Sequence, residues 1–285
     1  MRFTPRIMPE LPEVETVRRG LERTLVGRRF DEVTVGRERV ARRTSRKELR
    51  DGLTGARVVR VDRRGKYLLL ELDADSIAMV HLRMSGQVVV DEGRTAPPPH
   101  SHVVAELDDG KRMLFIDPRT FGEVVVASRG EVEILIPELG RLGVDPLVDG
   151  VTIDDVVSMC RNRRRRVKSL LLDQSEIAGI GNIYADEICH RSGIRPDRQA
   201  HTLSRRSCRR LADSIVDVIE EAVDLGGSTL ADAQYVGVDG EPGSYQDRHR
   251  VYARTGQRCM TCGRGIIRRT VIDQRGSHFC PVCQR

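Results

Sequence analysis

Four cysteines near the end of the chain constrain its folding more than any other feature. Cys259 and Cys262 form one Cys-x2-Cys pair, and Cys280 and Cys283 form a second pair after a gap of seventeen residues. Two such pairs can bring four thiolates to one tetrahedral Zn²⁺ ion, and four protein ligands leave no open position for catalysis. The spacing therefore predicts one structural zinc, with a disulfide or redox pair as the alternative.

Basic residues gather in two segments of the chain. The net charge is +6, from 48 Lys and Arg against 42 Asp and Glu, and residues 241–285 alone also sum to +6. Residues 161–168 (RNRRRRVK) hold six basic residues in eight. The stretch between the cysteine pairs carries Arg264, Arg268, Arg269 and Arg275. Such patches suit the phosphates of a nucleic acid, although solvated charged surfaces and a nuclear targeting signal are alternatives.

The apolar segments and the cysteines of the sequence indicate the cellular compartment of the protein. No segment approaches the ~20 apolar residues that span a membrane, and the first residues lack the apolar core of a signal peptide. Seven cysteines, four of them in the two pairs, favour a reducing environment over a disulfide framework. We therefore expect a cytoplasmic protein with no membrane partner.

Hydrophobic periodicity divides the chain into a β-rich first half and a helical second half. A helix is predicted over 13–25, with Val14, Val17, Leu21 and Leu25 on one face. Short β-branched segments follow at 31–37, 57–63, 66–72, 77–83, 87–91, 102–107, 112–116 and 123–127. Helical patterns return at 152–160, 167–174, 182–191 and 203–224. The pattern indicates an α+β chain with an antiparallel sandwich or barrel before a helical domain.

Two local motifs have ordinary structural explanations as well as functional ones. Gly179-Ile180-Gly181-Asn182 precedes a predicted helix, where free backbone N–H groups can bind a phosphate, but two glycines before a helix also form a plain turn. Met8-Pro9-Glu10-Leu11-Pro12-Glu13 precedes the first helix, and its proline and acids fit helix-start preferences. Neither motif identifies a function by itself.

Several segments together resemble the formamidopyrimidine-DNA glycosylase/endonuclease VIII family of base-excision-repair enzymes. The resemblance runs from Met8 to Arg285. It is carried, in chain order, by MPELPEVETVRRGL (8–21), RRGKYLLLEL (63–72), HLRMSG (81–86), DPRTFG (117–122), GIGNIYADE (179–187) and the segment from Arg275 to Cys283.

The resemblance implies a particular division of the chain. We expect a catalytic antiparallel β-sandwich with flanking helices over 8–141 and a linker over 142–150. A helix–two-turn–helix DNA-binding domain with a lesion-capping loop would cover 151–250, and a four-Cys zinc-finger hairpin 251–285. Family members begin at the methionine before Pro-Glu-Leu-Pro-Glu, and that methionine is removed. Residues 1–7 are therefore expected to be a mis-annotated extension, which makes the amine of Pro9 the terminal nucleophile.

The resemblance also implies roles for individual residues. Pro9 would attack the sugar and Glu10 would act as the general acid. Lys66 would assist β-elimination, and Arg275 would grip phosphate and assist δ-elimination. Supporting positions are Glu13 and Glu187.

Contacts with DNA are implied at His100, Arg119, Arg163, Lys168 and Asn182. Met84, Arg119 and Phe121 match the residues that fill the space left by an extruded base. Without the resemblance, Lys66, His100 and Arg119 would be taken for surface charges, and Met84 and Phe121 for core residues.

The expected function is removal of oxidised purines from damaged double-stranded DNA, followed by cleavage of the abasic site, by a monomer with one structural Zn²⁺. Three alternatives stay open: an endonuclease VIII-like oxidised-pyrimidine glycosylase, a non-catalytic damaged-DNA binder if Pro9 stays within the chain, and a zinc-ribbon transcription factor.

Overall fold

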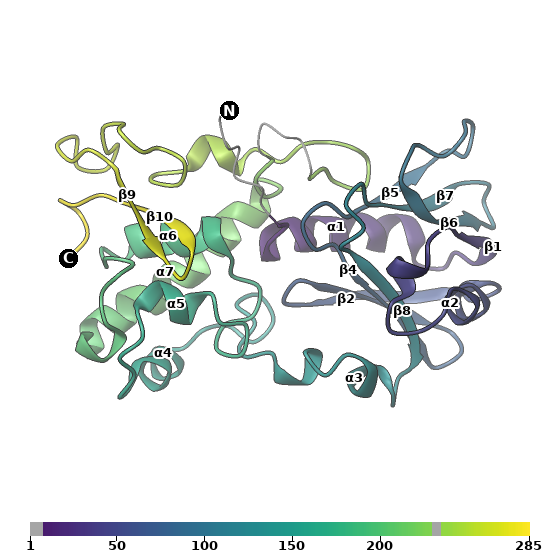
Figure 1. Ribbon diagram of the computed structural model, residues 1–285, viewed down its shortest axis with the longest axis horizontal. Coiled ribbons are helices and arrows are strands. Elements are labelled where there is room, and N and C mark those ends of the chain that lie inside the picture. Colours follow the sequence, from purple (N-terminus) through teal and green to yellow (C-terminus); the bar gives the residue numbers. More distant parts are fainter. Residues whose placement is uncertain (1–7, 230–234) are drawn as a thin grey trace. The chain divides into compact units, whose positions relative to one another are not determined.

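The computed structural model describes residues 8–229 and 235–285 (Figure 1). The predicted extension, residues 1–7, lies outside this part of the chain, as do residues 230–234. The chain forms two compact units: one contains the residues up to Gly140 together with 226–244, and the other contains 141–225 and 245–285. In the described ranges, no helix combines the length and the apolar character that a membrane crossing requires.

The N-terminal unit is built on two antiparallel four-stranded sheets. One has the order β1-β6-β7-β5 and the other β2-β3-β4-β8. The strands are β1 (Phe30–Val35), β2 (Val58–Arg64), β3 (Tyr67–Leu72), β4 (Ser76–His81), β5 (Gln87–Asp91), β6 (Ser101–Leu107), β7 (Arg112–Ile116) and β8 (Glu123–Ser128). Both sheets contribute buried side chains such as Val33, Val61, Val80 and Phe115 to one core. The predicted sandwich and all eight predicted strands are confirmed.

Helix α1 (Leu11–Leu25) covers this core with the face that the sequence predicts, because Val14, Val17, Leu21 and Leu25 are all buried. It begins two residues before the predicted start, since Glu10 and Glu13 close a capping box around its first turn. The short helices α2 (Arg46–Leu53) and α3 (Val132–Leu135) and the 3₁₀ turns η1 (Glu38–Ala41) and η2 (Leu139–Arg141) were not anticipated. Each offers too few apolar positions to show a period.

Residues 226–244 differ from the sequence expectation, which put them in a domain spanning 151–250. Tyr235 and Val238 belong to the core of the N-terminal unit, and the amide of Val90 donates to the carbonyl of Val238 at 3.2 Å. A Cβ at Gly20 of α1 would lie 2.8 Å from Val238 Cγ2. This close packing attaches the segment to the sandwich, although its sequence reads as a loop.

The C-terminal unit is helical and ends in a hairpin. Its helices are α4 (Ile153–Cys160), α5 (Val167–Leu171), α6 (Asn182–Arg191) and α7 (Arg205–Asp224), with 3₁₀ turns η3 (Ala200–Thr202) and η4 (Tyr245–Arg248). The long helix α7 buries Leu211, Ile215, Val218 and Ile219 and is followed by Gly226 and Gly227, both with positive φ. Strands β9 (Arg268–Ile272) and β10 (Arg275–Phe279) pair antiparallel. The predicted helices 152–160 and 182–191 match within one residue.

Candidate active site and nucleic-acid interface

The start of α1 holds Pro9 and Glu10 in a buried position. Glu10 and Glu13 are each 2% exposed. The amide of Glu10 donates to Glu13 Oε2 at 2.8 Å, and the amide of Ser228 donates to Glu13 Oε1 at 2.7 Å. Glu13 thus ties the Pro9-Glu10 segment to the chain around Gly227 and Ser228, where a Cβ on Gly227 would fall 2.7 Å from the same carboxylate. Glu13 thus holds the first turn of α1 against this part of the chain.

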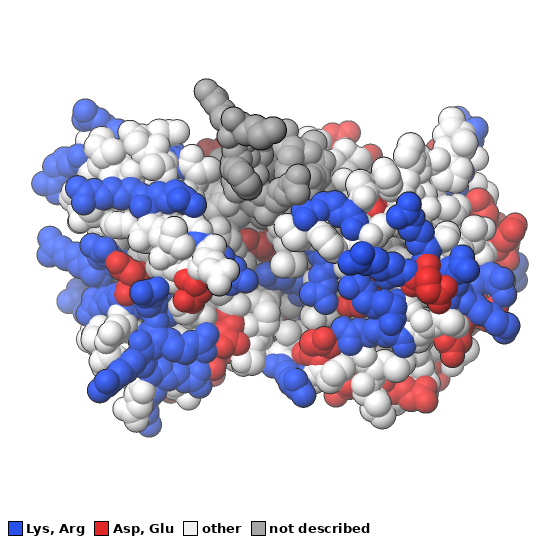
Figure 2. Space-filling view, viewed as in Figure 1, with Lys and Arg blue, Asp and Glu red and all other residues white. Residues whose placement is uncertain are grey.

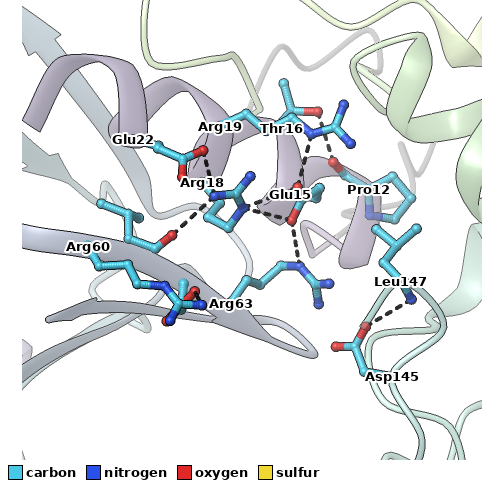
Figure 3. Close-up of polar contacts among 12 residues, drawn as sticks. Pro12, Glu15, Thr16, Arg18, Arg19, Glu22, Arg60, Arg63, Asp145 and Leu147 are labelled. Atoms are coloured by element: carbon cyan, nitrogen blue, oxygen red, sulfur yellow. Dashed lines mark hydrogen bonds and ion pairs between the residues drawn. The ribbon is translucent and has the colours of Figure 1, made fainter. Parts of the chain in front are cut away.

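Lys66 lies in the β2–β3 turn, which a buried ion pair fastens to α1 (Figure 3). Arg63 Nε donates to Glu15 Oε2 at 3.0 Å, and Arg63 Nη1 donates to the carbonyl of Gly65 at 2.9 Å. Glu15 also binds Arg18 and Arg19, at 3.1 and 3.0 Å. The turn is therefore fixed relative to the helix that begins beside Glu10. Sequence analysis did not single out Glu15 or Arg63, because no local pattern shows that an acid in a helix and an arginine in a strand are partners.

The three residues expected to fill an emptied base position lie on two neighbouring loops. Met84 is half-buried in the turn 82–86, and Arg119 and Phe121 are half-buried in the loop 117–122. The Arg119 guanidinium carbon lies 4.7 Å from the centroid of the Phe121 ring, a cation–π contact. Within the described ranges Arg119 Nη1 is buried and has no hydrogen-bond partner. An unsatisfied guanidinium N–H is suited to an acceptor from outside the protein.

Histidines flank these loops. His100 is exposed, has a φ of +69°, and its carbonyl accepts from the amide of Asp117 at 3.0 Å. His81 is buried, and burial together with the charges of Arg83 and Lys66 holds its pKa well below its usual value. The ring of His81 is therefore neutral, and its Nδ1 is 3.0 Å from the amide of Arg83, from which it accepts.

In the C-terminal unit, Asn182 is the first residue of α6. Gly181 caps this helix in an extended conformation and Gly179 has a φ of +90°, which glycine adopts without strain. Among the described residues, Asn182 Oδ1 is buried without a partner. Arg163 lies in the exposed basic run and pairs with Glu176. The N-terminus of a helix favours an anion through its dipole, so the start of α6 is a candidate phosphate site.

Lys168 does not fit the DNA contact that the sequence suggested. The Lys168 side chain is fully buried, its Nζ lies 2.7 Å from Asp186 Oδ1, and it donates to the carbonyl of Gly276 at 3.0 Å. Asp186 Oδ2 in turn accepts from the amide of His278 at 2.8 Å. Lys168 therefore joins α5 and α6 to strand β10. It stands in a basic run, but the fold turns it inward at the start of α5.

Glu187 anchors the chain just before the four zinc-binding cysteines. Its carboxylate accepts from the amides of Arg250, Val251 and Tyr252 at 2.8, 3.0 and 2.8 Å. Burial raises the pKa of Glu187, and the three amide donors oppose that rise. Like Asp186, Glu187 projects from α6, so two adjacent residues of this helix hold the C-terminal segment that carries the four cysteines.

The four cysteines fit a zinc ion. Their sulfur atoms all lie within 4.8 Å of one another, and the Sγ–Sγ distances are 3.8 Å for Cys259–Cys283 and for Cys262–Cys280. A tetrahedral site with Zn–S bonds of about 2.3 Å has edges of about 3.8 Å. The cysteines thus hold one structural zinc, and no fifth position is left for a reacting group.

Arg275 is the first residue of β10 and lies directly after the turn of the hairpin, in which Asp273 and Gln274 have positive φ. Its side chain is exposed, as are those of Arg264, Arg268 and Arg269. On the face shown in Figure 2, Lys and Arg side chains cover more of the surface than Asp and Glu side chains do. The hairpin therefore offers several unburied guanidinium groups to an anionic partner.

Three family models match the chain. They are the formamidopyrimidine-DNA glycosylase N-terminal domain over residues 8–124, the formamidopyrimidine-DNA glycosylase H2TH domain over 142–234, and a zinc finger found in FPG and IleRS over 256–285. The chain is similar to the formamidopyrimidine-DNA glycosylase of Xanthomonas euvesicatoria, with 41% identity over 98% of this chain and 100% of the relative. The relative from Thermus thermophilus is 42% identical over 97% of this chain and 98% of its own.

Solved structures agree with these matches. The crystal structure of the MutM (Fpg) protein from Thermus thermophilus superposes with a TM-score of 0.87 at 40% identity, covering 97% of this chain and 98% of that one. A complex between Lactococcus lactis Fpg and DNA containing an abasic site gives a TM-score of 0.88 at 33% identity, covering 97% and 99%.

Proposed function

The chain belongs to the formamidopyrimidine-DNA glycosylase family of DNA-repair enzymes, and we propose that it removes oxidised purines from double-stranded DNA and then cleaves the abasic site. The observation that carries the proposal is the start of α1, where Pro9 and Glu10 are buried and Glu13 holds the backbone of Glu10. The N-terminal family model also begins at residue 8.

The nucleophile in this proposal is the amine of Pro9 after removal of the residues before it. An α-amine has a pKa near 8, against about 10.4 for lysine, so far more of it is unprotonated at neutral pH. Its nitrogen attacks C1′ of the damaged nucleotide while the bond between C1′ and the base breaks. Glu10 acts as the general acid that protonates the opening sugar.

The lyase steps follow from the product of that attack. A secondary amine bound to C1′ gives a cationic iminium, which withdraws electrons and acidifies the C2′ proton. Loss of that proton expels the 3′-phosphate, and a second elimination expels the 5′-phosphate. In this proposal Lys66 assists the first elimination and Arg275 the second. The fixed β2–β3 turn supports the role of Lys66, and the exposed position at the hairpin end supports that of Arg275.

Oxidised purines, namely 8-oxoguanine and formamidopyrimidines, are the proposed substrates. An enzyme acting on a base within a duplex extrudes it and fills the space it leaves. Met84, Arg119 and Phe121 are the proposed filling residues, with Arg119 facing the cytosine left unpaired. The unsatisfied Nη1 of Arg119 supports this assignment. His100, Arg163 and Asn182 are proposed to bind the DNA backbone. The protein is proposed to act as a monomer in the bacterial cytoplasm.

The proposal is tested by trapping the iminium. Protein expressed from Met8 is incubated with a duplex containing 8-oxoguanine opposite cytosine, borohydride is added, and the adduct is identified by intact mass and peptide mapping. An adduct at Pro9 is expected. Protein whose chain retains residues 1–7 is the matched control and should give none, because Pro9 is then a tertiary amide.

Substitution of the acid separates catalysis from binding. Glu10→Gln should slow base release by about 10²- to 10⁴-fold, the usual contribution of a positioned acid, and leave DNA affinity nearly unchanged. Equal loss of both would contradict the role of Glu10. Intact DNA binding without any adduct would instead indicate a damage-binding protein, and an adduct only with oxidised pyrimidines would place the chain on the endonuclease VIII branch.

A further inference from the structure

The two loops that carry Met84, Arg119 and Phe121 run side by side between the two sheets. The turn 82–86 leaves β4 after His81 and enters β5 at Gln87, and the loop 117–122 leaves β7 after Ile116 and enters β8 at Glu123. His81 is paired with Glu123 in one sheet, and Gln87 with Ile116 in the other. Each loop therefore begins and ends beside the corresponding end of the other.

Asp117 links the two loops at one side. It is fully buried. Its Oδ1 accepts from the hydroxyl of Ser85 at 2.5 Å and from the amide of Arg119 at 3.1 Å, and its Oδ2 accepts from the amide of Gly122 at 2.7 Å. One carboxylate thus binds Ser85, the residue after Met84, in one loop. In the other loop it binds the amides of Arg119 and Gly122, at the two ends of the segment that includes Phe121.

Glu123 links the loops at the other side. It is also fully buried, and its Oε1 lies 3.3 Å from Arg83 Nη2, at the residue that precedes Met84. Its Oε2 pairs with Arg43 at 3.2 Å. Arg42, which lies 3.6 Å from the same oxygen, donates to the carbonyls of Phe121 and Gly122 at 2.5 and 2.9 Å. Met84 is therefore flanked by two residues that are each bonded to an end of the other loop.

The backbone of both loops is strained next to the same side chains. Arg83, which precedes Met84, has a φ of +54°, and Thr120, between Arg119 and Phe121, has a φ of +56°. Non-glycine residues in this region cost free energy and persist only where surrounding contacts hold them. The bonds of Asp117 and Glu123 supply such contacts at both places.

We propose that Asp117 and Glu123 are positioning residues that join the turn 82–86 and the loop 117–122 into one rigid wedge, so that Met84, Arg119 and Phe121 enter the duplex as a unit. The inference rests on the proposed function and adds to it a requirement specific to base extrusion. Excision of a stacked, paired lesion needs the complete wedge. Cleavage at an abasic site, where no base has to leave the stack, depends on it far less.

The mildest test is Ser85→Ala, which removes one link between the loops and no group that touches DNA or the reacting atoms in the proposal. Single-turnover excision from an 8-oxoguanine·cytosine duplex should slow by about tenfold and cleavage of an abasic duplex by less than about twofold, as expected for loss of one buried hydrogen bond that acts in extrusion. Ser101→Ala is the matched control, because in the described part of the chain its hydroxyl donates to the carbonyl of Pro98, just before β6, and does not link the two loops. Both rates should stay unchanged.

A double-mutant cycle shows whether Ser85 acts through Met84. In a Met84→Ala background, Ser85→Ala should cause little further slowing, because the side chain that it positions is already gone. Arg83→Met, which removes the link to Glu123, should reproduce the split between the two substrates. Asp117→Asn should do so more strongly if that variant folds.

Three results overturn the inference alone: equal slowing on both substrates, no slowing on either, or an undiminished effect of Ser85→Ala in the Met84→Ala background. All three require a wild-type protein that cleaves both duplexes. A wild-type protein started at Met8 that cleaves neither overturns the proposed function, and the inference with it.

Discussion

Buried charged and polar side chains hold the functional segments of this protein at the scale of single residues. Glu13 fixes the Pro9-Glu10 segment, Asp117 fixes the loop with Arg119, and Glu187 fixes the chain that precedes the zinc site. Each carboxylate accepts backbone N–H donors, which offset the cost of burying its charge. Buried groups of this kind also determine how stability depends on pH.

His249 provides a prediction for acid pH. It is 5% exposed and lies between the rings of Tyr245 and Tyr252, each 5.6 Å away between centroids. Burial, reinforced by the charges of Arg254 and His278, lowers the pKa of His249 from 6.5 to about 4. The unfolded chain therefore takes up a proton near pH 6.5 that the folded chain takes up only near pH 4. At about 1.4 kcal/mol per pKa unit, about 3 kcal/mol of stability is present above pH 6.5 and lost between pH 6.5 and 4.

Comparison with His249→Phe isolates this contribution, because phenylalanine keeps a ring but takes up no proton. The free energy of unfolding is measured for both proteins by denaturant titration at several pH values. Between pH 7 and pH 4 the difference should shift by about 2–3 kcal/mol in favour of the variant. The zinc thiolates titrate in both proteins and cancel in the subtraction. A difference independent of pH would show that His249 is not held neutral by the fold.

At the scale of elements, α6 organises the C-terminal unit. It begins at the candidate phosphate site with Asn182, and it carries Asp186 and Glu187, which bind the hairpin and the chain before the zinc ligands. His190, one turn further, places its Nε2 3.7 Å from the sulfur of Cys259. A single helix thus connects the candidate phosphate site, the hairpin with Arg275 and the metal site.

Lys168 tests this connection. Lys168→Met removes the buried partner of Asp186 and the donor to the Gly276 carbonyl. Breaking a buried ion pair on one side should cost about 3–5 kcal/mol of unfolding free energy. The control is Arg205→Ala, whose ion pair with Asp154 is exposed and should contribute at most about 1 kcal/mol. Denaturant titrations measure both.

Salt dependence of DNA binding distinguishes this structural role from a phosphate contact. Removing a phosphate contact lowers the slope of log K against log salt by about one. Arg275→Ala should show that change, and Lys168→Met should not. A reduced slope for Lys168→Met, together with unchanged stability, would restore the DNA contact suggested by the sequence.

At the scale of the whole molecule, the chain enters each of the two units twice, and its sequence does not show this. Residues 226–244 leave the C-terminal unit after α7, pack with the N-terminal core through Tyr235 and Val238, and return at Tyr245 to the unit that carries the zinc site. The hairpin is small, and its buried cluster consists of Val251 and Ile267 together with two of the cysteines. So small a core depends on its metal for stability.

Zinc removal should therefore affect the hairpin and its function together. Cys280→Ser should reduce the zinc content, measured by mass spectrometry of the metal, from one per chain to none, and it should abolish DNA binding because the hairpin arginines lose their scaffold. Cys208→Ser is the matched control, since Cys208 lies on α7 outside the four-cysteine cluster, and it should keep both zinc and DNA affinity. Full DNA affinity without zinc would contradict the role of the hairpin.

The sequence by itself determined the features that depend on local spacing. The two Cys-x2-Cys pairs defined the zinc site, alternation and β-branching located the strands, and the period of 3.6 residues located α1, α4, α6 and α7. The motifs at 8–21 and 117–122 indicated the family. Each of these signals lies within one segment, where backbone geometry and side-chain spacing are directly related.

Only the tertiary structure decided which charged residues are buried and with which partners. Lys168 reaches the carbonyl of Gly276, 108 residues away, and Ser85 reaches Asp117, 32 residues away. No local pattern distinguishes Lys168 from the exposed arginines before it, and only the packing of α5 and α6 against β10 removes it from water. The burial of a charge depends on partners that the chain brings together on folding, so its role becomes visible only in the folded molecule.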